Sequence, residues 1–209
     1  MSDLPEVIFD EGNHTYSQGG VAVPRSVTGL LKKYGLSVDY SDVPRSVLEL
    51  ARQRGNAIAA GRELIVNGLE LDPETVDPRI GGYLAALMTF WQQSGATLIE
   101  SEVPHVSPLG FGFRADIFCF INGRRTVIDD KATFKLPKSV GPQTAGYAIG
   151  WDSLYPKQPI EDRAALWLKK DGSFKFIALD DPDDRTAFMD VLQTVIRLEQ
   201  WVKKYGGKS

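Results

Sequence analysis

The feature that most constrains the fold is a hairpin pattern at the centre of the chain. Two sets of side chains alternate along residues 113–120, as they do when the two faces of a β-strand meet different surroundings. One set is Phe113, Ala115, Ile117 and Cys119, and the other is Arg114, Asp116, Phe118 and Phe120. Asn122-Gly123 follows, a pair that favours a two-residue hairpin turn because both residues tolerate positive φ. Residues 125–131 then return as the partner strand. The pattern therefore predicts two antiparallel strands.

The segments on either side of this hairpin predict a layered α/β or α+β fold. Apolar residues at helical spacing predict helices near residues 26–35, 44–68, 78–91, 142–154 and 182–202. The second of these can be interrupted at Gly55. Strand patterns cover a short hairpin in residues 7–23 and the segments 97–106, 164–169 and 174–179. We expect a mixed central sheet flanked by helices, with helical elaboration of the N-terminal part.

Length and composition limit the function. We expect one domain over residues 1–209, with a hairpin and helical part at 1–95 and a sheet core at 96–209. The net charge of -3 gives no overall basic character, so any contact with nucleic acid must come from a local patch. The single Cys119 excludes an internal disulfide and fits a reducing cytosol. We expect neither a signal peptide nor a membrane partner, because no apolar run approaches the ~20 residues of a membrane span.

Two carboxylates and a lysine lie on the two central strands. Asp129 and Lys131 are two positions apart and point the same way from a regular strand, and Asp116 lies on the paired strand. Magnesium usually binds one or two carboxylates together with water and phosphate oxygens, and a nearby lysine can position that water or stabilise developing charge. Asp130 is expected to face away from the site, although its backbone carbonyl can reach the ion. The plainer alternative is a salt bridge between Asp116 and Lys131.

Three motifs occur together and in order around this constellation. They are Gly112-x-x-x-Asp116, Asp129-Asp130-Lys131 and Gln143-x-x-x-Tyr147. With them the chain resembles the PD-(D/E)xK nuclease superfamily, and within it the RecB-like and phage-type exonuclease branch. The first motif has one residue more than the commoner Gly-x-x-Asp. Further similarity lies in His14-x-Tyr16, in Pro24-Arg25-Ser26-Val27-Thr28 and in Glu102.

The resemblance implies a restriction-endonuclease-like fold and the hydrolysis of DNA phosphodiester bonds with Mg²⁺ or Mn²⁺. It implies that Asp116 and Asp129 are metal ligands and that Lys131 assists the attacking water. Gln143 and Tyr147 would lie one turn apart on a helix and either contact DNA or support the site. The implied activity is that of an exonuclease that processes free DNA ends in phage recombination or repair. The resemblance also implies that the protein works in the cytoplasm of a bacterial host. A single-strand-annealing or recombination protein is then a candidate partner.

One position departs from the family pattern. Many RecB-like members have a metal-ligating His in a context similar to Arg-Gly-x-x-x-His, and here Arg54-Gly55 is followed by Ala59 at that place. Alanine cannot bind a metal, so either a ligand is lost or another residue of the helix, such as Glu63, replaces it. The alternative function is therefore a catalytically impaired DNA-binding protein of the same fold. A third is an interaction protein in which the motif match is due to chance.

Two lysines close to the constellation are candidate phosphate contacts. Lys135 and Lys138 follow the second central strand by a few residues. Lysine side chains there can hold the backbone of a nucleic acid. Solvated surface charge is the plainer interpretation of either one.

Overall fold

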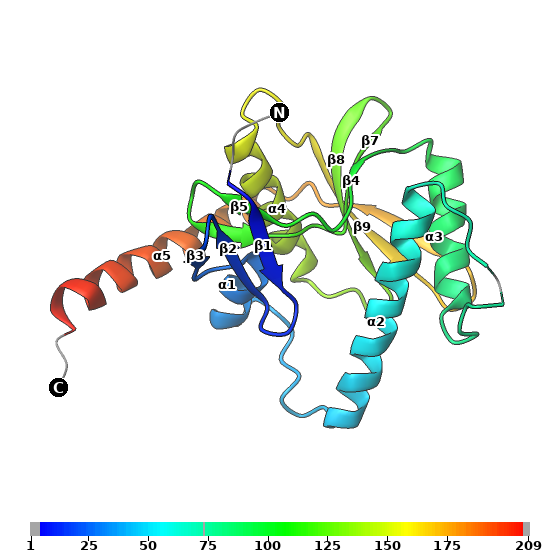
Figure 1. Cartoon of the computed structure of the whole chain (residues 1–209), viewed down its shortest axis with the longest axis horizontal. Coiled ribbons are helices and arrows are strands. Elements are labelled where there is room, and N and C mark those ends of the chain that lie inside the picture. Colours follow the sequence, from blue (N-terminus) through cyan, green and yellow to red (C-terminus); the bar gives the residue numbers. More distant parts are fainter. Residues whose placement is uncertain (1–4, 73, 207–209) are drawn as a thin grey trace.

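The computed structural model describes residues 5–72 and 74–206, which form a mixed α/β fold (Figure 1). Its strands are β1 (Val7–Asp10), β2 (Thr15–Gln18), β3 (Val21–Val23), β4 (Thr97–Glu100), β5 (His105–Ser107), β6 (Phe111–Phe113), β7 (Ile117–Ile121), β8 (Arg124–Lys131), β9 (Asp162–Leu168) and β10 (Phe174–Ala178). Its helices are α1 (Val27–Lys33), α2 (Arg45–Val66), α3 (Gly81–Ser94), α4 (Val140–Leu154) and α5 (Asp183–Tyr205). The mixed fold class is therefore as the sequence predicts.

The central sheet has the strand order β10-β9-β8-β7-β4. Strand β8 runs parallel to β9, and the other neighbouring strands run antiparallel. The parallel pair arises because α4 connects β8 to β9, and a crossover helix is the usual way to join parallel strands. The sheet is thus mixed.

The predicted central hairpin is confirmed. Strands β7 and β8 are antiparallel, with Ile117 opposite Ile128 and Ile121 opposite Arg124. The turn between them has positive φ at Asn122 (51°) and at Gly123 (77°). This is the conformation for which the Asn-Gly pair is favoured, because its twist matches that of the two strands.

The two faces of the sheet are covered by different helices (Figure 1). Ile117, Ile128 and Leu166 pack in a core with residues of α2 and α3. Phe118 and Val127, next to them in sequence, pack in a second core with residues of α1, α4 and α5. This alternation is the period of two that the sequence shows. Segments from both parts of the chain, before and after residue 95, contribute to each core.

The N-terminal elements form as expected and close one end of the second core. Strands β1, β2 and β3 make a small antiparallel sheet. Ser26 caps α1, because its Oγ accepts a hydrogen bond from the Gly29 N–H at 3.1 Å. A β-carbon at Gly112 would lie 2.3 Å from the Tyr16 ring, so a glycine there lets the small sheet approach β6 closely.

Two predicted strands are interrupted. The segment 97–106 divides into β4 and β5, and the alternating segment 113–120 divides into β6 and β7. Strands β5 and β6 pair with each other in a separate two-stranded sheet, so the chain bends away from the central sheet and returns. Glu102 lies in this bend with a φ of 55°, and its N–H bonds to the Ala115 carbonyl at 3.1 Å. The interruption brings Glu102 close to Asp116.

The helix over residues 44–68 is continuous. Helix α2 passes through Gly55 without a break, and nothing lies within 4 Å of a β-carbon at that exposed position. Within the described ranges, no helix has the length and apolar character needed to cross a membrane.

Candidate active site

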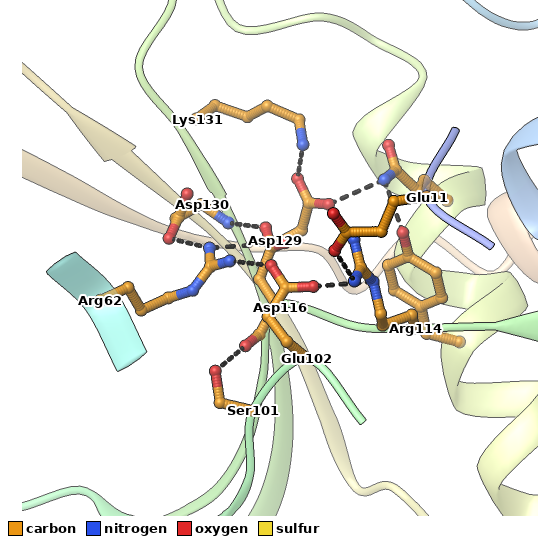
Figure 2. Close-up of polar contacts among 11 residues, drawn as sticks. Glu11, Arg62, Ser101, Glu102, Arg114, Asp116, Asp129, Asp130 and Lys131 are labelled. Carbon is orange, nitrogen blue, oxygen red and sulfur yellow. Dashed lines mark hydrogen bonds and ion pairs between the residues drawn. The ribbon is translucent and has the colours of Figure 1, made fainter. Parts of the chain in front are cut away.

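The candidate site lies where β7 begins and β8 ends (Figure 2). Asp129 is fully buried, and Lys131, two positions on, forms an ion pair with its Oδ2. From α4, the Gln143 amide donates hydrogen bonds to Asp129 Oδ1 and to the Tyr147 hydroxyl, each at 2.8 Å. Gln143 therefore holds the Asp129 carboxylate from the protein interior, and the buried Tyr147 holds Gln143.

Asp116 lies between Asp129, which α4 contacts, and Arg62 of α2. It directly precedes β7, and its Oδ2 accepts a hydrogen bond from the Asp130 N–H at 2.8 Å. Ser101 holds the backbone here, because its hydroxyl donates to the Asp116 carbonyl at 2.7 Å. Asp116 and Asp129 therefore lie at neighbouring strand ends, and Asp116 is bonded to the residue that follows Asp129.

A buried arginine from α2 fills the opposite side of the site. The Arg62 side chain is 2% exposed, and its guanidinium forms ion pairs with Glu102 and Asp130. A third carboxylate, that of Asp116, lies 3.4 Å from Arg62 Nη1. Figure 2 shows these acidic groups gathered around the end of Arg62.

The side chain of Asp130 is part of this arrangement. The regular strand does turn it away from Asp129, as expected, but it points at α2 rather than into solvent and is 9% exposed. Its partner there is Arg62, which sequence analysis missed. The backbone N–H of Asp130 bonds to Asp116, and its carboxylate pairs with Arg62, a role for the side chain that the sequence does not predict.

Arg114 is a second basic residue that sequence analysis missed. Its Nε lies 2.9 Å from Glu102, and its Nη1 lies 3.2 Å from Glu11. The guanidinium also lies over the Phe9 ring, 4.3 Å from its centre. Arg114 therefore ties the N-terminal sheet to the edge of the site.

Burial and like charges perturb the titration of these groups. Burial raises the pKa of Asp129 to about 7, the nearby charge of Asp116 adds to this, and Lys131 opposes it. Burial also raises the pKa of Glu102 and of Asp130, against the attraction of Arg62. Although burial alone would lower it, the pKa of Lys131 is raised to about 12 by the negative charge of Asp129. Lys131 is consequently an ammonium ion at neutral pH.

Two cavities open beside these groups. The first, of about 330 Å³, lies between α2 and the ends of β7 and β8, and Ala59, Arg62, Asp116 and Lys131 line it. The second, of about 170 Å³, lies toward the N-terminal hairpin, and His14, Tyr16, Asp116 and Tyr147 line it. Asp116 borders both cavities, so a ligand can approach it from either side.

The two candidate positions on α2 have different surroundings. Ala59 lines the first cavity together with Arg62 and Asp116. Glu63 is exposed and is not among the residues that line this cavity. Successive helical residues point about 100° apart, so the inward direction of Arg62 turns Glu63 away. The structure therefore does not bring Glu63 to the site, and Arg62 is the residue of this turn that reaches it.

Two carboxylates are the candidate donors for a metal ion at this end of the strands. Asp116 and Asp129 each offer carboxylate oxygens, and Asp116 accepts a hydrogen bond from the Asp130 N–H. No group of three or more His, Cys, Asp or Glu within residues 5–72 and 74–206 is arranged to hold a metal ion. An ion would thus depend on two carboxylates and water, and proteins usually bind magnesium through one or two carboxylates together with waters and substrate phosphates. The pKa of Asp129 is raised chiefly by burial, and a cation bound beside its carboxylate would lower it.

Comparison with known proteins does not identify this chain. No protein family matches it, and no curated protein matches it significantly. Among solved structures it is similar to one described as "Crystal structure of SSO0001", with 16% sequence identity. That match covers 86% of this chain and 90% of the other, with a TM-score of 0.36. A likeness this weak supports no argument about fold family or function.

Proposed function

We propose that this protein is a metal-dependent deoxyribonuclease with a restriction-endonuclease-like core. The observation that carries the proposal is the group of Asp116, Asp129 and Lys131 at one edge of a mixed sheet, with Gln143 and Tyr147 behind Asp129. These are the residues that the three sequence motifs contain. The resemblance further supports an exonuclease of phage recombination or repair, acting on DNA ends in a bacterial cytoplasm.

The residues of the chain have distinct tasks in this proposal. Asp116 and Asp129, with the Asp130 carbonyl, would hold Mg²⁺ or Mn²⁺, which lowers the pKa of a bound water and neutralises charge on the scissile phosphate. Lys131 is protonated, since Asp129 raises its pKa to about 12. It therefore acts as a hydrogen-bond donor to water or phosphate oxygen rather than as a base.

Gln143 orients Asp129 in this scheme. An amide donating to Asp129 Oδ1 at 2.8 Å fixes which oxygen faces Lys131. The Tyr147 hydroxyl accepts the second hydrogen bond of the same amide and so fixes Gln143. The Gln-x-x-x-Tyr motif thus supports the carboxylate from one turn of α4.

Cleavage of end-labelled DNA tests the proposal. Linear and closed circular DNA, each single- and double-stranded, are incubated with magnesium, manganese or chelator. We expect cleavage of linear DNA with metal only, abolished by Asp116→Asn and reduced about 10²–10³-fold by Lys131→Ala. Chelator-resistant cleavage, or cleavage unaffected by Asp116→Asn, contradicts the proposed site.

A second candidate function is DNA binding without cleavage. Two observations favour it. Ala59 occupies the expected ligand position, and the Arg62 guanidinium already supplies a positive charge to Glu102, Asp116 and Asp130. In that case the parent protein binds labelled DNA but leaves every form intact with either metal. The same assay therefore separates the two candidates.

A further inference from the structure

A groove extends from the candidate site along the start of α2. It has a volume of about 700 Å³ and lies between residues 38–54 and the loop 133–138 that connects β8 to α4. Ala51, Arg54 and Thr133 line both this groove and the cavity that contains Asp116 and Lys131. The groove and the site are therefore continuous.

The groove presents an aromatic ring to solvent on a fixed loop. The Phe134 side chain is 101% exposed, and Tyr40, which also lines the groove, is 49% exposed. The backbone beside Phe134 is held, because the Trp167 Nε1–H donates to the Thr133 carbonyl at 2.8 Å. The Thr133 hydroxyl also donates to the Lys135 carbonyl at 3.0 Å. Val38 and Val47, which are also exposed, line the same groove, so the ring belongs to a larger apolar patch, and such a patch marks a binding surface.

The charge of the groove suits a polyanion. Arg54, Lys135 and Lys138 line it, and no acidic residue is among the described residues that do so. This is a local excess on a chain whose net charge is -3. The other large cavity, of about 760 Å³, is mixed in charge, since Asp152, Glu161, Asp162, Asp180 and Asp181 line it together with Arg124, Arg163 and Arg185. Positive charge with exposed aromatic rings is the combination that binds single-stranded nucleic acid.

We propose that this groove binds a single-stranded segment of DNA that leads into the site. Phe134 and Tyr40 stack on unpaired bases, while Arg54, Lys135 and Lys138 contact phosphates. Inside a duplex both faces of a base are covered by its neighbours, so apart from the terminal pairs only an unpaired base can stack on Phe134. This inference rests on the proposed function, because it names the substrate of that site as DNA with a single-stranded end.

Binding measured without metal tests the groove separately from cleavage. Fluorescence anisotropy in chelator compares a labelled oligothymidine with a blunt duplex of equal length. We expect tighter binding of the single strand, and Phe134→Ala to weaken it roughly 5- to 150-fold, which corresponds to ~1–3 kcal/mol for one stacked base. Trp201→Ala is the matched control, since Trp201 is 60% exposed on α5, and it should leave the affinity unchanged.

The salt dependence tests the phosphate contacts. Each phosphate contact on a single strand adds about 0.7 to the slope of log K against log salt. Lys135→Gln with Lys138→Gln should therefore reduce that slope by about 1.4. Lys203→Gln with Lys204→Gln, at the end of α5, makes the same change in net charge and should leave the slope unchanged.

The outcomes separate the groove from the nuclease. No binding of the single strand, or equal binding by Phe134→Ala and the parent, overturns the groove even where cleavage depends on Asp116. An equal loss of affinity for the duplex in Phe134→Ala also overturns it, because only the terminal pairs of a blunt duplex leave a base face open. Binding that depends on Phe134, without cleavage under any metal, supports the groove and refutes the nuclease. The substitutions in the groove and on α5 are all at exposed positions, and a melting temperature close to that of the parent confirms that each variant folds.

Discussion

Replacing Arg62 with methionine probes the buried charges at the site. The substitution keeps an unbranched side chain but removes the positive charge that faces three carboxylates. Glu102 keeps the Arg114 Nε at 2.9 Å. Asp116 keeps the Asp130 N–H at 2.8 Å. Asp130, whose side chain is 9% exposed, loses its cation, so most of the effect comes from this group.

The size of the effect follows from what is lost. Two charge-assisted hydrogen bonds of the guanidinium disappear, each of about 1.5–3 kcal/mol. Breaking a buried ion pair by removing one partner costs about 3–5 kcal/mol, because the other charge stays buried. We therefore expect Arg62→Met to lower the free energy of unfolding by about 3–5 kcal/mol at neutral pH.

The effect should shrink in acid. Burial already raises the pKa of Asp130 and of Glu102, and removing Arg62 raises both further. The folded variant then binds protons more tightly than the unfolded chain, so its stability rises as the pH falls toward the usual carboxylate range. The difference between variant and parent is consequently largest at about pH 7.5 and smaller at about pH 5.

Urea denaturation followed by circular dichroism measures this at both pH values. Arg52→Met is the control, since Arg52 is an exposed arginine of the same helix paired with Glu49, and it should change stability little. Equal losses for the two variants, or a loss for Arg62→Met that does not depend on pH, would show that Arg62 does not neutralise buried carboxylates.

Three further predictions concern single positions. Burial raises the pKa of Asp129 from 3.8 to about 7, so the folded protein binds that proton more tightly and the free energy of unfolding falls as pH rises through this window. Asp129→Asn should remove this fall, of up to about 4 kcal/mol, in denaturation at a series of pH values, and an unchanged pH profile would contradict it. Gly112→Ala should destabilise by about 1–3 kcal/mol, because the added β-carbon lies 2.3 Å from the Tyr16 ring. Gly55→Ala, with open space around it in α2, should instead stabilise by about 0.5–1 kcal/mol. Stability changes of the same sign in Gly112→Ala and Gly55→Ala would contradict this prediction. Ala59→His should tighten manganese binding more than magnesium binding in calorimetry, since imidazole is the softer ligand, whereas Ala60→His, on an exposed position, should change neither.

The central hairpin and its polar residues were within reach of sequence analysis because they depend on local rules. Asn122-Gly123 determines the turn, and the period of two puts Asp129 and Lys131 on one face, where they pair. Gln143 and Tyr147 share a helical face for the same reason. Each of these relations spans few residues, so the sequence alone carries it.

The other half of the site depends on contacts between distant segments. Arg62 and Asp130 are 68 positions apart, and nothing in the pattern of α2 distinguishes an arginine that points inward from a solvated one. The break between β6 and β7 was also missed, because the alternation continues through residues 114–116 although the chain there leaves the sheet. Long-range pairing of β5 with β6 decides this bend, and such pairing overrides the local pattern.

Manganese binding tests the central claim most directly, because the proposed nuclease requires Asp116 and Asp129 to hold one divalent cation. Titration followed by electron paramagnetic resonance counts bound manganese in the parent, in Asp116→Asn, in Asp129→Asn and in Lys131→Ala. We predict one site in the parent, strong loss of affinity in both Asn variants, and nearly unchanged affinity in Lys131→Ala with its cleavage of labelled DNA reduced. Unchanged manganese affinity in both Asn variants would contradict the account.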